Sequence, residues 1–107
     1  MTSEEKTGVV FRFFQALDKI IANGTLKGRQ TFTRLYNINR WNLYTVEDNP
    51  SSNMFDIAWL VYLVRDFGVN ADWLLMGRGE MFYTMKDLNK LRKAHDFAES
   101  SQMADKT

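Results

Sequence analysis

The residues best suited to bind a partner lie in the middle of the chain, at Arg40, Trp41, Tyr44 and Thr45. The guanidinium of an arginine carries a fork of N–H donors that matches O6 and N7 of guanine. Exposed aromatic rings can pack on thymine methyl groups or on sugar, and they can equally anchor a contact with another protein. The residue types therefore leave open two classes of partner, double-stranded DNA and a second protein.

Two short helices joined by a turn are predicted around these residues, in the segment 27–49. Phe32, Leu35 and Tyr36 fall at i, i+3 and i+4, which gives the first helix one apolar stripe. Arg34 points away from that stripe. The first helix therefore has one face for the core and one for solvent.

The turn between the two helices is predicted at Asn37–Ile38–Asn39. Asparagine tolerates the left-handed conformation that a sharp turn needs, and Asn39 is a good N-cap for a second helix beginning near Arg40. The inner face of that helix consists of hydrophobic residues three positions apart and the middle residue of the turn: Ile38, Leu43 and Val46. The partner-binding residues therefore face solvent.

This pattern resembles the helix-turn-helix domains of the lambda-repressor-like (Xre-type) regulators of bacteria and phages. Those domains have a hydrophobic residue in the first helix, then a turn residue near positive φ, a hydrophobic residue and a cap. Hydrophobic residues three apart and an acidic residue follow. The corresponding residues here are, in order, Phe32, Asn37, Ile38, Asn39, Leu43, Val46 and Glu47. Thr33, Asn37 and Arg29 stand where the family usually has Ala, Gly and often Gln, and Thr33 places a polar side chain at the helix crossing.

A second resemblance lies in the segment NADWLLMGRGEM at 70–81. It is similar to the capped helix and WLLxGxG sequence that follow the helix-turn-helix of phage-type repressors. The two segments together span most of residues 9–81. They imply a compact all-α, five-helix lambda-repressor-like domain over residues 1–83, with its helix-turn-helix at 28–48. A C-terminal helix and tail would follow at 84–107.

The resemblance also implies roles for individual residues, because the second helix of the motif lies in the DNA major groove in that family. Carried over by position, the base contacts are Arg40, Trp41, Tyr44 and Thr45. The phosphate contacts are Lys27, Arg29, Arg34 and Asn39. The implied function is sequence-specific binding of double-stranded DNA by a small, repressor-like transcriptional regulator. A protein-interaction module that keeps the fold and uses Trp41 and Tyr44 is the alternative.

Charge is distributed unevenly along the chain, although the net charge is only +1. Residues 1–40 contain seven Lys or Arg and three Asp or Glu, a balance of +4. Residues 41–80 contain two and six, a balance of −4. The segment 27–40 holds four basic residues and no acidic one. Such a segment suits a surface that faces phosphates, and a solvated basic face has the same composition.

The composition is that of one globular domain of 107 residues, with 45% hydrophobic and 25% charged residues. The lack of cysteine excludes a disulfide framework and a thiolate metal site, and no residue spacing indicates a metal or cofactor. His95 is the only histidine, and an enzyme is not expected. With no signal peptide or long apolar run, the chain is expected in the cytoplasm and not in a membrane.

Helical spacing predicts two longer helices around the motif. The first covers residues 8–23, with residues 3–5 ahead of it as a frayed terminus. The other covers residues 54–67, and Ser52 or Asn53 would cap it. Its apolar residues leave little polar face, so this helix is expected to be buried on most sides.

Two more helices are predicted in the last third of the chain. A short one after Asn70 should return Trp73 and Leu74 to the core and end at Gly77. The last covers residues 84–100 and has a narrow stripe formed by Leu88, Leu91, Ala94, His95 and Ala98. Such a helix either docks on its own domain or pairs with another copy, so a homodimer through this helix is one expected arrangement.

Overall fold

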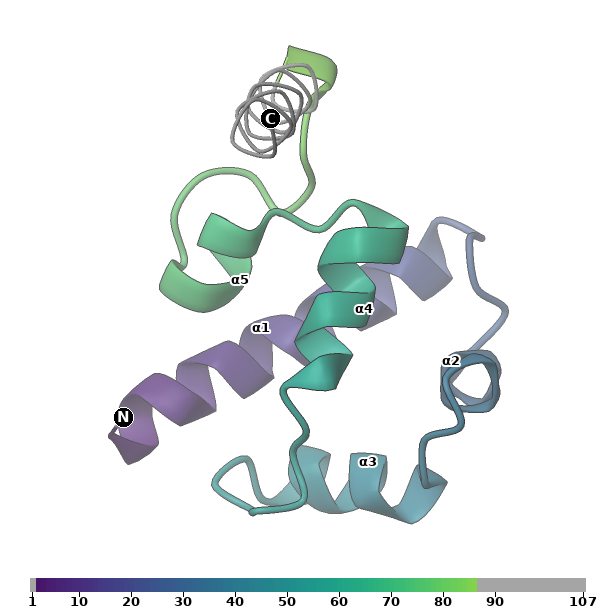
Figure 1. The fold of residues 1–107 in the computed structure, drawn as a ribbon, viewed down its shortest axis with the longest axis vertical. Coiled ribbons are helices and arrows are strands. Elements are labelled where there is room, and N and C mark those ends of the chain that lie inside the picture. Colours follow the sequence, from purple (N-terminus) through teal and green to yellow (C-terminus); the bar gives the residue numbers. More distant parts are fainter. Residues whose placement is uncertain (1, 87–107) are drawn as a thin grey trace, which may run out of the picture.

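The computed structural model describes residues 2–86, which form five helices joined by loops (Figure 1). They are α1 (Ser3–Ala22), α2 (Arg29–Leu35), α3 (Arg40–Asp48), α4 (Ala58–Phe67) and α5 (Ala71–Met76). The predicted all-α class is confirmed. Within this part of the chain, extended pairing is limited to one isolated antiparallel bridge, between Val69 and Phe82. No helix among these five has the length and apolar character to cross a membrane. The stripe predicted from Leu88 to Ala98 lies outside the described residues.

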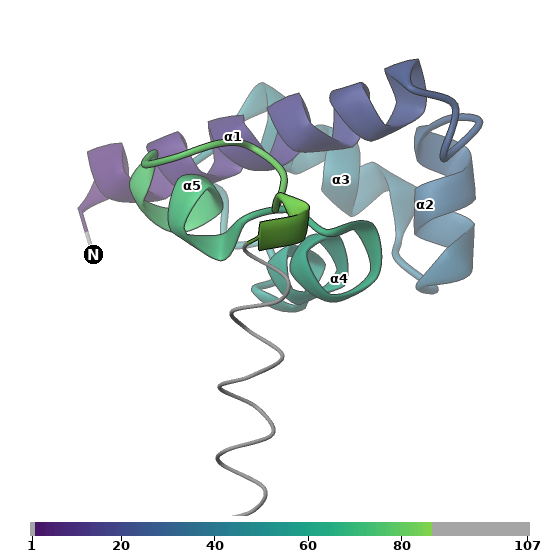
Figure 2. The same cartoon turned by 90° about the horizontal axis from the view of Figure 1, so that it is seen from above.

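Helix α1 is the element against which the other four helices pack. It runs behind α4, with α5 beside its first half, while α2 and α3 lie toward the other side of the molecule (Figures 1 and 2). Its buried residues recur at helical spacing and are Val9, Val10, Phe13, Phe14, Ala16, Leu17 and Ile20. The other four helices therefore pack against one wide apolar face of α1.

Helix α1 begins at Ser3, earlier than the predicted start at Gly8. Thr2 Oγ1 accepts a hydrogen bond from Glu5 N at 3.1 Å, and Glu5 Oε2 accepts one from Thr2 N at 3.0 Å. This reciprocal capping box satisfies N–H groups that a helix start otherwise leaves unpaired, and the carboxylate lies at the positive end of the helix dipole. The prediction of a frayed terminus at residues 3–5 is therefore wrong.

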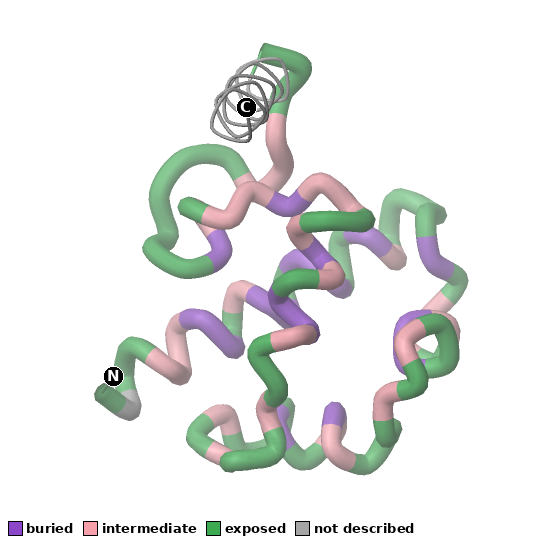
Figure 3. Tube along the Cα trace, viewed as in Figure 1, coloured by how far each residue is buried: buried purple, intermediate pink, exposed green. Residues whose placement is uncertain are grey.

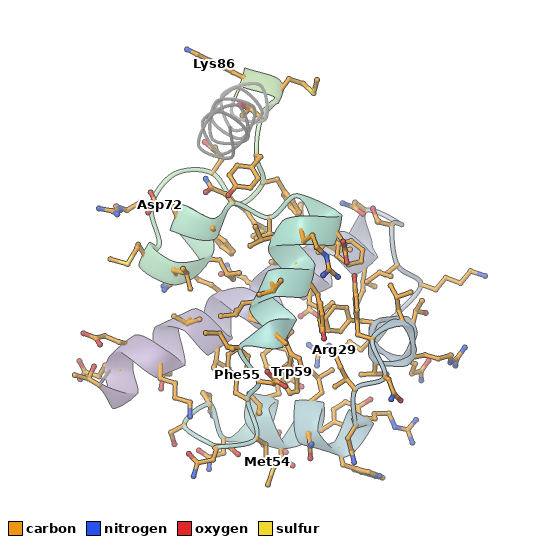
Figure 4. The ribbon with its side chains drawn as sticks, in the orientation of Figure 1. Arg29, Met54, Phe55, Trp59, Asp72 and Lys86 are labelled. Carbon is orange, nitrogen blue, oxygen red and sulfur yellow. The ribbon has the colours of Figure 1, made fainter. Side chains whose placement is uncertain are left out.

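The centre of the core is a cluster of aromatic rings around Phe13. This fully buried side chain lies 5.1 Å from Phe14, 5.7 Å from Phe55, 5.9 Å from Trp59 and 6.0 Å from Phe32, measured between ring centres. Trp59, on α4, is buried, and Phe55, in the loop before α4, is partly buried beside it (Figure 4). Edge-to-face and tilted pairs at these distances add to the stabilisation from burial.

Helix α4 begins at Ala58 instead of the predicted Met54. The reason is Asp56, whose Oδ1 accepts a hydrogen bond from Ala58 N at 2.9 Å and holds the backbone in a turn before the helix. The hydroxyl of Ser52, predicted as a cap, accepts one from Met54 N at 3.2 Å within the preceding loop. The non-helical backbone here lets Phe55 pack inward while Met54 stays exposed (Figure 4).

Helix α4 is buried or half-buried on most sides, as predicted, but one side is open to solvent. Ile57 is 73% exposed and Val61 is 49% exposed (Figure 3 shows burial along the chain). The two residues are four positions apart and share a face. An apolar groove of about 320 Å³, the α4–α5 groove, is lined by Ile57, Leu60, Val61, Val64, Arg65, Ala71, Leu74 and Leu75.

Arg12 fastens the end of α5 to α1. Its Nε donates a hydrogen bond to Leu74 O at 2.8 Å, and its Nη2 donates one to Leu75 O at 3.0 Å. The last carbonyls of a helix have no partner within that helix, so the guanidinium supplies donors and favourable charge at its negative end. The contact joins residues 62 and 63 positions apart.

The chain after α5 returns along the junction of α4 and α5. Tyr83 N donates to Gly68 O at 2.9 Å, and the Tyr83 hydroxyl accepts a hydrogen bond from Ala71 N at 3.0 Å. Leu74 is fully buried as predicted, whereas Trp73 is only half-buried against the core. Leu74 is therefore the anchor of the short helix.

Leu74→Ala should lower the free energy of unfolding by about 2 to 5 kcal/mol, because it leaves a cavity beside α1 and α4. Leu75→Ala is the matched control: it removes the same group from a half-exposed neighbour and should cost less than about 1 kcal/mol. Urea unfolding followed by circular dichroism measures both. Equal losses in the two variants would contradict the packing of α5.

Candidate nucleic-acid interface

The turn between α2 and α3 has the predicted geometry. Asn37 has a φ of 53°, in the left-handed region, and the next amide, Ile38 N, donates to Thr33 O at 2.8 Å. Thr33 is buried at the helix crossing, and its hydroxyl donates to Gln30 O at 3.0 Å. The polar side chain is thus satisfied locally, and the two helices keep a tight connection.

Asn39 fixes the start of α3. Its Oδ1 accepts hydrogen bonds from Trp41 N at 2.9 Å and from Asn42 N at 3.4 Å. The bond to Trp41 N satisfies a first-turn N–H group, and Asn42 N also donates to the backbone oxygen Asn39 O at 3.1 Å. The cap therefore sets the backbone of the first turn, and α3 begins at Arg40 as predicted.

The exposed side of α3 carries the predicted base-contact residues, which we call the α3 outer face: Arg40, Trp41, Tyr44 and Thr45. The inner side carries the predicted inward residues, Ile38, Leu43 and Val46, and the last two are fully buried. Trp41 is 69% exposed, Arg40 and Thr45 are also exposed, and Tyr44 is half-buried. Arg40 Cζ lies 5.7 Å from the centre of the Trp41 ring, and the Tyr44 ring meets it in a T-shaped contact at 6.3 Å.

A polar hollow of about 520 Å³ lies beside this face, between α2 and α3. It is lined by Gln30, Thr33, Arg34, Asn37, Ile38 and Arg40. Two guanidinium groups and two primary amides around one concavity offer many N–H donors, which suit a phosphate oxygen. The sequence pattern does not single out Gln30, although its position four residues before Arg34 puts both on one helix face.

Arg29, at the first position of α2, is held by carboxylates from two other helices. Its guanidinium contacts Asp18 of α1 at 2.9 Å and Glu47 of α3 at 2.6 Å. Its Cζ also lies 5.1 Å from the centre of the Phe14 ring. Burial by itself lowers the pKa of Arg29, but the hydrogen bonds to Glu47 and Asp18 outweigh burial and raise it. These contacts form what we call the Arg29 clamp, which joins α1, α2 and α3.

The other predicted phosphate contacts are placed differently. Lys27 and Arg34 are exposed, and within residues 2–86 neither forms a salt bridge. The side-chain oxygen of Asn39 belongs to the α3 cap. The structure therefore brings Arg34 together with the α3 outer face, while the donors of Arg29 are engaged within the fold.

Leu35 is 60% exposed, so its predicted place on the inner stripe of α2 is wrong. The next residue, Tyr36, turns inward as predicted. Its ring lies 5.2 Å from Phe32 and stacks on Tyr62 at 4.0 Å. The stacked pair brings the end of α2 against α4.

A hydrogen-bond chain completes this contact between α2 and α4. The Tyr36 hydroxyl donates to Asp66 Oδ2 at 2.6 Å, and Arg65 Nη2 donates to the same oxygen at 2.8 Å. Burial, followed by the bond to Asp66, raises the pKa of Tyr36 to about 12. Arg65, followed by Tyr36, lowers the pKa of Asp66 to about 2. The α2–α3 pair is thus held from two sides, by Arg29 and by Tyr36.

Comparison with known proteins gives no match to this chain among family models, curated proteins or solved structures. The geometry of α2 and α3 and the charges around them are therefore the observations that bear on function.

Arg29→Ala should lower the free energy of unfolding by about 1 to 2 kcal/mol, because it removes two solvent-screened ion pairs and a cation–π contact together. Arg34→Ala removes the same charge from an exposed position of the same helix. It should change stability by less than about 0.5 kcal/mol. Urea unfolding of both variants measures the difference, and equal stability would contradict the Arg29 clamp.

Tyr36 should ionise late, because its pKa is raised to about 12. Its pKa is higher in the fold than in the unfolded chain, so its contribution to stability is complete below about pH 10 and is lost toward about pH 12. Absorbance titration should show a late step that Tyr36→Phe removes. The stability of the wild type should also fall more steeply over this pH range than that of the variant. Superimposable titrations would rule out the Tyr36–Asp66 bond.

Proposed function

We propose that this chain is a lambda-repressor-like helix-turn-helix domain that binds double-stranded DNA as a small cytoplasmic transcriptional regulator, without catalysis. The observation that carries the proposal is the α3 outer face. Its backbone is fixed by a cap, its opposite side is buried, and it presents an arginine and two aromatic rings beside a hollow lined by donors. A helix held in this way can enter a major groove as a rigid body.

The position of each side chain on α3 supports base contacts. In helix-turn-helix proteins the N-terminal residues of the second helix contact base edges. Arg40 and Trp41 are the first two residues of α3, and Tyr44 and Thr45 follow one turn later. Arg40 is assigned to guanine, Trp41 and Tyr44 to apolar contacts, and Thr45 to either kind of base.

Two exposed cations that form no salt bridge within residues 2–86, Lys27 before α2 and Arg34 on α2, support contacts with the DNA backbone. We assign phosphate contacts to Lys27 and Arg34, with the amides of Gln30 and Asn37 as neutral donors in the hollow. Asn39 can contact a phosphate only through its amide nitrogen, because its side-chain oxygen caps α3. Arg29 is not assigned a phosphate contact, because a phosphate would have to displace Asp18 and Glu47 from its guanidinium.

A protein-interaction module remains the second candidate, and the α4–α5 groove is the observation that favours it. Its lining is almost wholly apolar, and α5 lies well above α3 in the view of Figure 1. Exposed apolar grooves of this kind suit an amphipathic helix. The expected homodimer through the C-terminal helix depends on residues beyond those described and stays a proposal.

The proposed function predicts distinct salt effects for three variants. Lys27→Ala and Arg34→Ala should weaken binding to all duplexes and lower the slope of log affinity against log salt by about one each. Arg40→Ala should cost roughly 1 to 3 kcal/mol on a duplex selected from random sequences and little on mixed-sequence DNA. Fluorescence anisotropy at several salt concentrations measures both quantities.

Arg78→Ala is the control for charge. It removes one positive charge from an exposed residue that pairs with Asp72, at a distance from α3. Its salt slope should equal that of the wild type. Flat titrations with mixed-sequence duplex at low salt, where non-specific binding is strongest, would overturn the DNA-binding proposal and favour a protein partner.

A further inference from the structure

Trp41 is largely exposed, and its ring contacts two neighbouring side chains. The Asn39 cap fixes its backbone, the Arg40 guanidinium lies over its ring, and Tyr44 supports it from one turn further on. An aromatic side chain has few rotatable bonds, so these contacts leave it little freedom to lose on binding. The ring therefore loses little conformational freedom when it contacts an apolar partner.

The major groove offers few apolar groups. Base edges there present hydrogen-bond donors and acceptors, and the main apolar feature is the C5-methyl group of thymine. A C5-methyl group on cytosine would occupy the same place in the groove. An indole ring entering the groove at the start of α3 thus has one kind of apolar contact to make, a methylated pyrimidine.

The contact between Arg40 and Trp41 adds a second requirement. The guanidinium suits O6 and N7 of guanine, and within residues 2–86 no carboxylate pairs with it. Its Cζ lies 5.7 Å from the ring centre, so the two groups cannot contact widely separated bases. Successive bases on one strand are about 3.4 Å apart along the axis. The two side chains therefore reach neighbouring base pairs.

We infer that the α3 outer face recognises a C5-methylated pyrimidine next to a guanine, with Trp41 on the methyl group and Arg40 on the guanine. This inference rests on the proposed DNA binding and specifies its ligand. In ordinary DNA the step is thymine beside guanine, and in methylated DNA it is 5-methylcytosine beside guanine. The recognised group is the same in both.

The test uses the full chain and a preferred duplex selected from random sequences. Each thymine beside a guanine is replaced in turn by deoxyuridine, which keeps the base pair and lacks only the methyl group. At one position the affinity should fall about fourfold, as expected for one buried methyl group. Replacing thymines elsewhere in the duplex should have no comparable effect. In a second arm, a cytosine at the sensitive position is compared with 5-methylcytosine. Preference for the methylated form would show that the methyl group of 5-methylcytosine is recognised as well as that of thymine.

Protein variants assign the effect to Trp41. Trp41→Ala should bind the thymine and deoxyuridine duplexes equally, whereas Trp41→Phe should keep most of the preference. Leu75→Ala, which removes an exposed apolar group on α5, should behave as the wild type. Because Trp41 is exposed, the variants are expected to fold, and circular dichroism checks that they do.

The outcomes separate this inference from the function on which it rests. Salt-dependent binding with equal affinity for thymine and deoxyuridine duplexes at every position would overturn methyl recognition and leave DNA binding intact. A thymine preference that persists in Trp41→Ala would also overturn it. Absence of binding to any duplex at low salt would overturn the proposed function itself and point to a protein partner for Trp41.

Discussion

Burial of one face of α1 is the constraint on which every other helix depends. Helices α2, α3 and α5 have seven, nine and six residues, and helices of that length are not stable alone in water. They form because the buried face of α1 offers all three a common apolar surface. The position of α3 is thus set by the core on its inner side, and its outer side remains available for a partner.

The arginines of α2 and α3 have two different roles, one within the fold and one at the surface. Arg29 points toward Asp18 and Glu47 and becomes part of the fold, whereas Arg34 and Arg40 line the hollow and, among residues 2–86, have no carboxylate partner. Sequence position does not reveal this division, because all three arginines lie in one basic stretch. A basic segment therefore says less about nucleic acid binding than the number of its charges that remain unpaired after folding.

Features that depend on a few neighbouring residues could be predicted from the sequence. The left-handed Asn37, the Asn39 cap and the buried Leu43 and Val46 follow from local geometry and helical spacing. Features that depend on distant residues, or on two local patterns that compete for the same segment, could not be predicted. Leu35 and Tyr36 fit the apolar stripe equally well, and the stacking partner Tyr62 decides between them. Asp56 competes with the helix pattern before α4, and the partners of Arg29 come from two other helices.

The contact of Arg12 with the end of α5 has a consequence for folding during translation. Helix α1 leaves the ribosome before the other four and makes its contact with α5 through a residue 62 positions later. At typical elongation rates that interval is roughly 3 to 12 seconds. Throughout it, part of the apolar face of α1 has no cover. Until α5 has also left the ribosome, the nascent chain exposes part of this face, and slow elongation lengthens the period in which it can aggregate.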